Sequence, residues 1–195
     1  SMHSITDASL VAARQKWVGQ FEALPRPLVA VLIGGTNKTY HMTADITRQI
    51  ANDLLRLKAT SGCGLLVTAS RRTGEENLMT LRDMLSQPGI YYWEGGGENP
   101  YKAFLEAADA FLVSADSINM ISEACFTGKP VYILPLEGGA GSKFERFHRE
   151  MSEAGHTRTF AGDLEDWSPV RLDQTTFAAR EIFIRLSGDG STQVK

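Results

Sequence analysis

Short apolar runs recur along the chain, and each is followed by a segment in which apolar residues return at helical spacing. The runs are residues 28–33, 65–69, 90–93, 110–113 and 131–134. Because these runs are apolar at consecutive positions, they are typical of strands covered on both faces. The helical stripes between them are Ile46, Ile50, Leu54 and Leu57, then Leu78, Leu81 and Leu85, then Ile118, Ile121 and Cys125. The pattern predicts an α/β fold, a Rossmann-like, doubly wound parallel sheet.

The ends of the chain differ from this central pattern. We expect residues 1–24 to form an N-terminal helix, over Asp7–Phe21, and a linker. Residues 25–186 would form the Rossmann-like domain, closed by a helix over Gln174–Leu186, and 187–195 a frayed Gly/Ser-rich tail. Ser1-Met2 resembles an expression scar before an internal start, so we expect half of a larger protein.

Composition excludes several classes of protein. Hydrophobic residues make up 43% and charged residues 22%, values of an ordinary globular domain and not of a disordered chain. A net charge of −3 argues against a nucleic-acid partner held by bulk positive charge. Cys63 and Cys125 have no CxxC spacing, so we expect reduced thiols and no metal site. The sequence shows no secretory signal and no apolar run of about 20 residues. We therefore expect a cytoplasmic location, with peripheral membrane contact left open.

Polar and glycine-rich segments follow the predicted strands, where parallel sheets bind ligands. After the first strand, Gly34-Gly35-Thr36-Asn37-Lys38 would let the backbone approach an anion, or would simply make a tight βα turn. After the second, Ser70-Arg71-Arg72 offers forked donors for phosphate, or solvated arginines on a helix with Thr73 as N-cap and Glu76 as its capping-box partner.

The third and fourth strands lead into further candidates. Asn99 would cap a helix beginning at Pro100, and Trp93 would stack on a base or pack in the core. Asp116 or Ser117 would cap the next helix, on which Ser117, Met120 and Glu123 share one face. Glu123 would accept hydrogen bonds from a ribose diol, or would be a surface glutamate balancing Lys129. We expect His41, His148 and His156 on the surface, because their spacing does not fit metal ligands.

These segments in order resemble the mitochondrial fission "elongated mitochondria" family, whose bacterial members are often labelled nucleoside-diphosphate-sugar epimerases. The resembling segments are Val31–Gly35, Ser70–Thr73, Gly97–Tyr101, Asp116–Ala124 and Thr127–Tyr132. The plant member acts in recruiting a dynamin-related protein to mitochondria. The chain is more distantly similar to the C-terminal, donor-binding half of GT-B glycosyltransferases, such as the lipid-II-forming N-acetylglucosaminyl transferase. There, Gly34-Gly35-Thr36 matches a phosphate-contacting loop and Ser122-Glu123 matches the ribose-binding pair, while Asp116 stands where small residues are common.

The resemblance implies a nucleoside diphosphate sugar as ligand and a glycosyltransferase or epimerase as the activity. It also implies a missing N-terminal domain that carries the catalytic base, so we assign binding residues and no catalytic one. The candidate binding residues are Gly34, Gly35, Thr36, Asn37, Lys38, Ser70, Arg71, Arg72, Asn99, Asp116, Ser117, Met120, Ser122 and Glu123. The alternative is a catalytically silent GT-B-like scaffold that recruits a protein partner at a membrane surface. A nicotinamide oxidoreductase is disfavoured because GxGxxG is missing.

Overall fold

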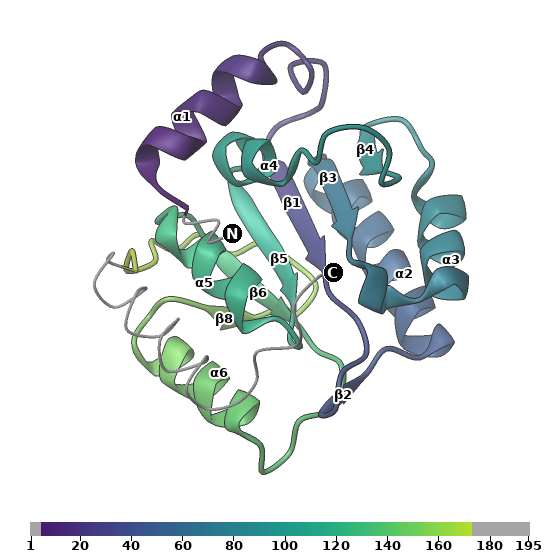
Figure 1. Ribbon diagram of the computed structural model, residues 1–195, viewed down its shortest axis with the longest axis vertical. Coiled ribbons are helices and arrows are strands. Elements are labelled where there is room, and N and C mark those ends of the chain that lie inside the picture. Colours follow the sequence, from purple (N-terminus) through teal and green to yellow (C-terminus); the bar gives the residue numbers. More distant parts are fainter. Residues whose placement is uncertain (1–4, 173–195) are drawn as a thin grey trace.

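A computed structural model describes residues 5–172 of the chain. In that part, six parallel strands form one sheet in the order β4-β3-β1-β5-β6-β8, with helices on both sides (Figure 1). The sheet strands are β1 (Leu28–Ile33), β3 (Gly64–Ala69), β4 (Ile90–Trp93), β5 (Ala110–Ser114), β6 (Val131–Leu134) and β8 (Arg158–Thr159). Counted along the chain this is the order 3-2-1-4-5-6 of a doubly wound sheet, which confirms the predicted fold class.

The helices divide between the two faces of the sheet. They are α1 (Asp7–Lys16), α2 (Ala44–Ser61), α3 (Glu75–Leu85), α4 (Tyr101–Ala107), α5 (Ile118–Phe126) and α6 (Lys143–Glu153). Because neighbouring strand residues point to opposite faces, Leu28, Ala30 and Leu32 join the core shared with α1, α4, α5 and α6. Val29, Val31 and Ile33 join the core shared with α2 and α3. All six residues of β1 are buried, as its unbroken apolar run predicts.

Polar residues set the helix ends. Thr43 caps α2 by accepting a hydrogen bond from the Ile46 N–H, and Gly62 ends that helix in the left-handed conformation with φ 70°. Ser117 caps α5, which settles the choice between Asp116 and Ser117 in favour of the serine. Ser142 caps α6 in the same way. Hydroxyl side chains therefore fix where three of the connecting helices begin.

Some local predictions need correction. Helix α1 ends at Lys16, although Phe21 still packs into the core by edge contacts with Tyr91 and Phe104. Thr73 is not an N-cap: it lies in a 3₁₀ turn (η1, Arg71–Thr73), and its hydroxyl donates to the Gly34 carbonyl. Helix α3 begins after Gly74 without a side-chain cap.

The apolar pattern did not predict one element, and two predicted segments lie outside the residues that the structure describes. A two-stranded antiparallel ribbon, β2 (Tyr40–His41) with β7 (Glu137–Gly138), was not predicted. The predicted helix over Gln174–Leu186 and the tail 187–195 lie outside the described residues. Within residues 5–172, no helix is both long and apolar enough to cross a bilayer.

Candidate functional site

The loops after β1, β3 and β5 meet at the carboxyl edge of the sheet, where the strand order reverses. We call this meeting point the β1–β5 junction, and it comprises Gly34–Asn37, Ser70–Thr73 and Ser114–Ser117. It forms because β1 pairs with β3 on one side and with β5 on the other. In doubly wound sheets this reversal is where ligands bind. The sequence placed candidates at the carboxyl end of each predicted strand, and those after β1, β3 and β5 meet here.

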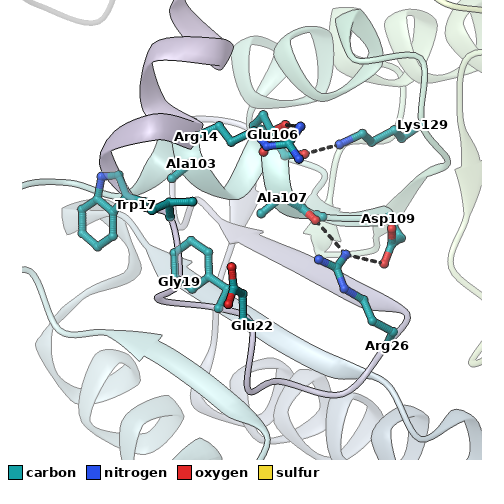
Figure 2. Close-up of a pocket in the computed structure, with 13 residues that line it drawn as sticks. Arg14, Trp17, Gly19, Glu22, Arg26, Ala103, Glu106, Ala107, Asp109 and Lys129 are labelled. Carbon is teal, nitrogen blue, oxygen red and sulfur yellow. Dashed lines mark hydrogen bonds and ion pairs between the residues drawn. The ribbon is translucent and has the colours of Figure 1, made fainter.

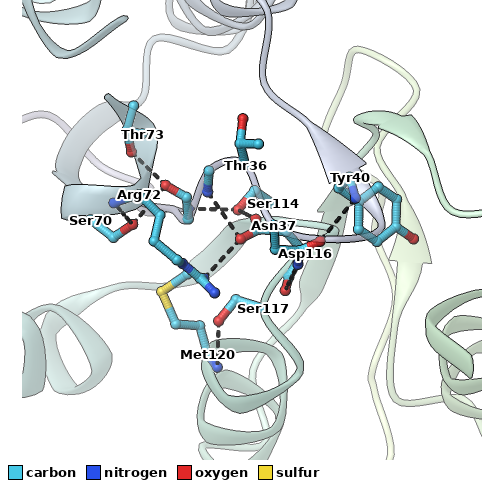
Figure 3. A network of polar contacts seen from close by, with 12 residues as sticks. Thr36, Asn37, Tyr40, Ser70, Arg72, Thr73, Ser114, Asp116, Ser117 and Met120 are labelled. Carbon is cyan, nitrogen blue, oxygen red and sulfur yellow. Dashed lines mark hydrogen bonds and ion pairs between the residues drawn. The ribbon is translucent and has the colours of Figure 1, made fainter. Parts of the chain in front are cut away.

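The carboxylate of Asp116 is the centre of this junction (Figure 3). It accepts hydrogen bonds from the Ser114 hydroxyl at 2.6 Å and from the Gly35 N–H at 2.9 Å. Arg72 adds an ion pair, with Nη2 2.8 Å from Oδ2. The Asp116 side chain is 0% exposed, whereas that of Arg72 is 41% exposed. Burial raises the pKa of Asp116, although the Ser114 hydroxyl, Arg72 and the Gly35 N–H each act to lower it.

The backbone N–H groups of the loop after β1 already have partners within the protein. The Gly34 N–H donates to Ser114 Oγ at 2.7 Å and the Gly35 N–H to Asp116. The Thr36 N–H donates to the Arg72 carbonyl at 3.1 Å, and the Asn37 N–H to that of Tyr40 at 3.0 Å. A phosphate would have to compete with each of these bonds to be held by this loop.

The two glycines of the loop are required by contacts within the protein. A Cβ on Gly34 would lie 2.2 Å from Asp116 Oδ2, and a Cβ on Gly35 would lie 2.1 Å from the Arg72 carbonyl oxygen. Both distances are far shorter than any van der Waals contact. The loops after β1, β3 and β5 therefore pack so closely that only glycine fits at both positions.

An open groove of about 760 Å³ lies beside the junction, over the carboxyl ends of β1, β3 and β4. Its walls carry two cations, Arg71 and Arg82, and two carboxylates, Glu75 and Glu94. They also carry the amide of Asn99 and the aromatic rings of Tyr92, Trp93 and Tyr101. Met120 of α5 forms part of the same lining. Asn99 accepts a hydrogen bond from the Tyr101 N–H at 2.9 Å, although the residue at the N-cap position of α4 is Pro100.

Glu123 lies behind this groove and is held by Tyr101. The Tyr101 hydroxyl donates a short hydrogen bond to Glu123 Oε2. Burial, and after it the negative charge of Glu123, raises the pKa of Tyr101 well above its usual range, so the hydroxyl is protonated and donates. Lys129 does not balance Glu123, because its ammonium donates to the Leu105 and Glu106 carbonyls.

The predicted binding residues thus fall into two neighbouring groups and a remainder. Those at the junction are Gly34, Gly35, Asn37, Arg72, Asp116 and Ser117. Those lining the groove are Ser70, Arg71, Asn99 and Met120. Of the others, Thr36 belongs to the junction through its N–H but is exposed, Lys38 is exposed, and Ser122 is buried with no hydrogen-bond partner for its hydroxyl among the described residues. Ligand contact by any of them stays a prediction.

A second pocket, of about 290 Å³, lies between α1 and α4 and reaches the residues that precede β1 and β5 (Figure 2). Four of its charged side chains are paired with one another, Arg14 with Glu106 and Arg26 with Asp109, and Lys129 donates to the Leu105 and Glu106 carbonyls. Asp109 also accepts a hydrogen bond from the Leu28 N–H at 2.7 Å. Since ligands of parallel sheets bind at the opposite edge, we assign this pocket a structural role.

The sequence did not indicate two histidines that the fold buries in part or whole. His148 was expected on the surface, but its ring Nε2 lies 2.9 Å from the Ala115 carbonyl, next to the junction. His156 is 8% exposed, with Nδ1 2.6 Å from the Val170 carbonyl. Helical spacing could have placed His148 one turn from the buried Phe144 on α6. Among the described residues no cluster of His, Cys, Asp or Glu is arranged to hold a metal ion.

Comparison with known proteins decides the family. The model of the family described as Mitochondrial fission ELM1 matches residues 1–186. The chain belongs to this family. It is 36% identical over 193 residues to the Mitochondrial fission protein ELM1 of Arabidopsis thaliana, covering 97% of this chain and 45% of that protein. It is 28% identical to the uncharacterized protein RP120 of Rickettsia prowazekii (strain Madrid E), covering 80% of this chain and 46% of that one.

The resemblance stated from the sequence is therefore confirmed, and the chain spans about half the length of the curated relatives it matches. Among solved structures, a protein of Listeria monocytogenes matches with a TM-score of 0.54 at 12% identity, over 90% of this chain and 40% of that one. Its assignment as a UDP-N-acetylglucosamine 2-epimerase is provisional. At this identity the match concerns the fold alone, and it agrees with the predicted GT-B-like α/β architecture.

Proposed function

We propose that this member of the ELM1 family is the donor-binding half of a GT-B-like protein and that the groove over β1, β3 and β4 binds a nucleotide sugar. The groove itself is the observation that carries the proposal. Its volume of about 760 Å³ is in the range of small-molecule sites, and it lies at the edge of the sheet where such sites form. The structurally similar Listeria protein carries the name of an enzyme that acts on such a nucleotide sugar, which supports this choice of ligand.

The lining of the groove fits the parts of a nucleotide. The Trp93 ring is half-buried, and its indole N–H donates to the Gly96 carbonyl at 3.1 Å, which fixes one edge of the ring while a face can stack on a base. Asn99 offers an amide for the edge of that base. Glu123 does not line the groove itself but is held by the lining residue Tyr101, one helical turn from Met120, and there it would receive the ribose diol.

Arg71 is the group best placed for a phosphate in this scheme. It is exposed and lines the groove, whereas the adjacent Arg72 is engaged with Asp116. A guanidinium binds phosphate oxygens in a bidentate manner and would stabilise the charge that develops on a leaving diphosphate. The acceptor and the catalytic base would come from the remainder of a protein that is about twice as long as this chain. We place such a protein in the cytoplasm, with contact to a membrane surface as part of the same proposal.

The second candidate is a scaffold that recruits a protein partner, and the β1–β5 junction favours it. The loop after β1 has its N–H groups engaged and a carboxylate at its centre, an arrangement that serves packing. The chain belongs to a family described as Mitochondrial fission ELM1, and that description is compatible with an interaction role. Nucleotide binding at the groove separates the two candidates.

Thermal shift and calorimetric titration with UDP, GDP, ADP, CDP and TDP, each with and without a sugar, test the proposal. A ligand at about 100 times its dissociation constant stabilises a protein by roughly 2.7 kcal/mol, so binding is easily seen. Glu123→Ala should weaken binding by roughly 1–3 kcal/mol through loss of charged hydrogen bonds. Arg71→Met should also weaken it, and Arg48→Met, which removes an exposed arginine outside the groove lining, is the matched control.

Two results would count against the groove. Absence of any shift at millimolar nucleotide would favour the scaffold. Binding that Glu123→Ala and Arg71→Met both leave unchanged would place the nucleotide elsewhere on the chain.

A further inference from the structure

We propose that Asp116 is a built-in anion that occupies the phosphate position of the β1–β5 junction. In the intact protein this carboxylate excludes ligand phosphate from the Gly34–Lys38 loop. Asp116 is thereby a specificity-determining residue. The outer phosphate of a nucleotide bound in the groove makes no contact with that loop and adds no affinity through it. This last consequence rests on the proposed function, whereas the anion position itself does not.

The donors around Asp116 form a complete site for an oxyanion. A backbone N–H from the loop after β1, a guanidinium from the turn after β3 and a hydroxyl from the end of β5 converge on one carboxylate, at distances of 2.6 to 2.9 Å. A glycine N–H together with a forked cation is the set of groups that proteins use to hold phosphate oxygens. These donors come from three separate segments, so the tertiary fold pre-forms the site (Figure 3).

The space at this position is already filled. The Asp116 side chain is 0% exposed, and its oxygens lie 2.2 and 2.3 Å from where a Cβ on Gly34 would be. The Gly34 backbone therefore has room for this carboxylate and for no further group. A phosphate entering here would also meet the negative charge of Asp116 at contact distance, which is strongly repulsive in a buried setting.

The sequence supports the same interpretation. In the glycine-rich loops of Rossmann folds, glycine lets a ligand approach the backbone. Here Gly34 instead lets the protein's own carboxylate approach. Arg72, which would otherwise be available to a phosphate beside Arg71, instead forms an ion pair with the Asp116 carboxylate.

Removing the carboxylate should expose the site to small anions, which the variant Asp116→Ala tests without any nucleotide. Sodium formate, which matches the deleted group, and inorganic phosphate are titrated against sodium chloride at equal ionic strength, and the melting temperature is followed. We expect formate to raise it by about 3–5 °C at ten times its dissociation constant. Phosphate should act similarly if the emptied space admits a tetrahedral ion. The unaltered protein should not respond to formate, and a phosphate response that it owes to Arg71 should persist in Arg72→Met.

Two controls make the result specific. Asp109→Ala removes an aspartate that also accepts from a β1 N–H and pairs with an arginine, but at the exposed opposite end, and it should gain no anion response. Asp116→Ser serves as a second emptied variant where Asp116→Ala does not fold, since its short hydroxyl also leaves the carboxylate position vacant. No formate effect in either folded variant would overturn the proposal. A saturable phosphate response of the unaltered protein that Arg72→Met abolishes would overturn it too.

The nucleotide arm separates this inference from the proposed function. If the groove binds nucleotides, Asp116→Ala should prefer a diphosphate over the matching monophosphate by about tenfold more than the unaltered protein does, the worth of one charge-assisted hydrogen bond. The same preference in the two proteins would overturn the exclusion of phosphate. If no nucleotide binds at all, the proposed function fails, and the formate result still decides whether Asp116 fills an anion site.

Discussion

Two aspartate–arginine pairs tie β1 to β5 at opposite ends of the sheet, and they differ in burial. At the amino end, Asp109 accepts from the Leu28 N–H and pairs with Arg26 at 2.9 Å. At the carboxyl end, Asp116 accepts from the Gly35 N–H and pairs with Arg72 at 2.8 Å. The Asp109 side chain is 47% exposed, whereas that of Asp116 is fully buried.

The difference shows how one motif serves two purposes. Asp109 satisfies a strand N–H at the rim, where water could replace it at little loss. Asp116 is closed off from water, so no water molecule could replace its carboxylate. The three groups that donate to it, one of them the Gly35 N–H, therefore depend on Asp116 as their acceptor. The exposed pair therefore holds the amino ends of β1 and β5 together. The buried pair sets the geometry of the edge at which the sheet would bind a ligand.

The largest effect should come from crowding the buried pair. Gly34→Ala places a Cβ 2.2 Å from an Asp116 oxygen, so the carboxylate must leave its partners or the strand must shift. We expect the free energy of unfolding, measured by urea denaturation, to fall by about 4 kcal/mol. Adding Asp116→Gly to Gly34→Ala should restore part of this loss, because the clash is then gone. Strict additivity of the two changes would contradict a direct contact.

Deleting each carboxylate compares the pairs directly. Asp116→Ala leaves a buried N–H, a hydroxyl and a guanidinium without their acceptor, and it should lower the free energy of unfolding by about 3 kcal/mol. Asp109→Ala should lower it by about 1 kcal/mol, because Asp109 is half-exposed and water can enter the space that its carboxylate leaves. Equal losses in urea denaturation would show that burial does not distinguish the two pairs.

Replacing the arginines should give smaller effects and should separate stability from binding. Arg72→Met removes the charge partner of a buried carboxylate and should cost about 1–2 kcal/mol, whereas Arg26→Met should cost about 0.5 kcal/mol. Arg71→Met, one position away, should leave stability unchanged and weaken nucleotide binding about tenfold. Chemical denaturation and calorimetric titration of the three variants check both readouts.

The smallest effect is a dependence of stability on pH. Since burial raises the pKa of Asp116, the folded protein binds a proton there at a higher pH than the unfolded chain does. Lowering the pH through the folded pKa toward the unfolded value of about 4 should therefore add stability from this group. Asp116→Asn should lack this contribution, and Asp109→Asn controls for loss of one negative charge. A gain that persists in Asp116→Asn would assign it to another group.

Much of the sheet could be read from apolar runs. The predicted runs 28–33, 90–93 and 131–134 coincide with β1, β4 and β6, because four to six consecutive apolar residues have few other places in a folded chain. The ribbon of Tyr40–His41 with Glu137–Gly138 was missed, since two-residue strands carry no periodicity. Thr73 was misassigned as a cap because its true acceptor, the Gly34 carbonyl, is 39 positions away.

The candidate site was predicted as a set of residues and not as an arrangement. Strand-end positions put Gly34, Arg72 and Asp116 among the candidates, and the fold brings these three residues together. No pattern along the chain indicated that their polar groups would bond to one another. Two adjacent arginines look equivalent in a sequence, yet one lines the groove and the other pairs with a buried carboxylate. Glu123 was expected to be free for ribose or balanced by Lys129, and its partner is Tyr101, from another helix.

The sequence by itself determined the fold class, the order of strands and helices along the chain, and the family, because apolar periodicity and ordered motifs are local properties. Only the tertiary structure decided which polar groups face a groove and which are bonded to one another. That decision depends on contacts between segments about 40 to 80 residues apart, which bring the loops after β1, β3 and β5 to within hydrogen-bond distance. Burial then gives those contacts their weight, since a carboxylate without access to water must be held by the protein itself.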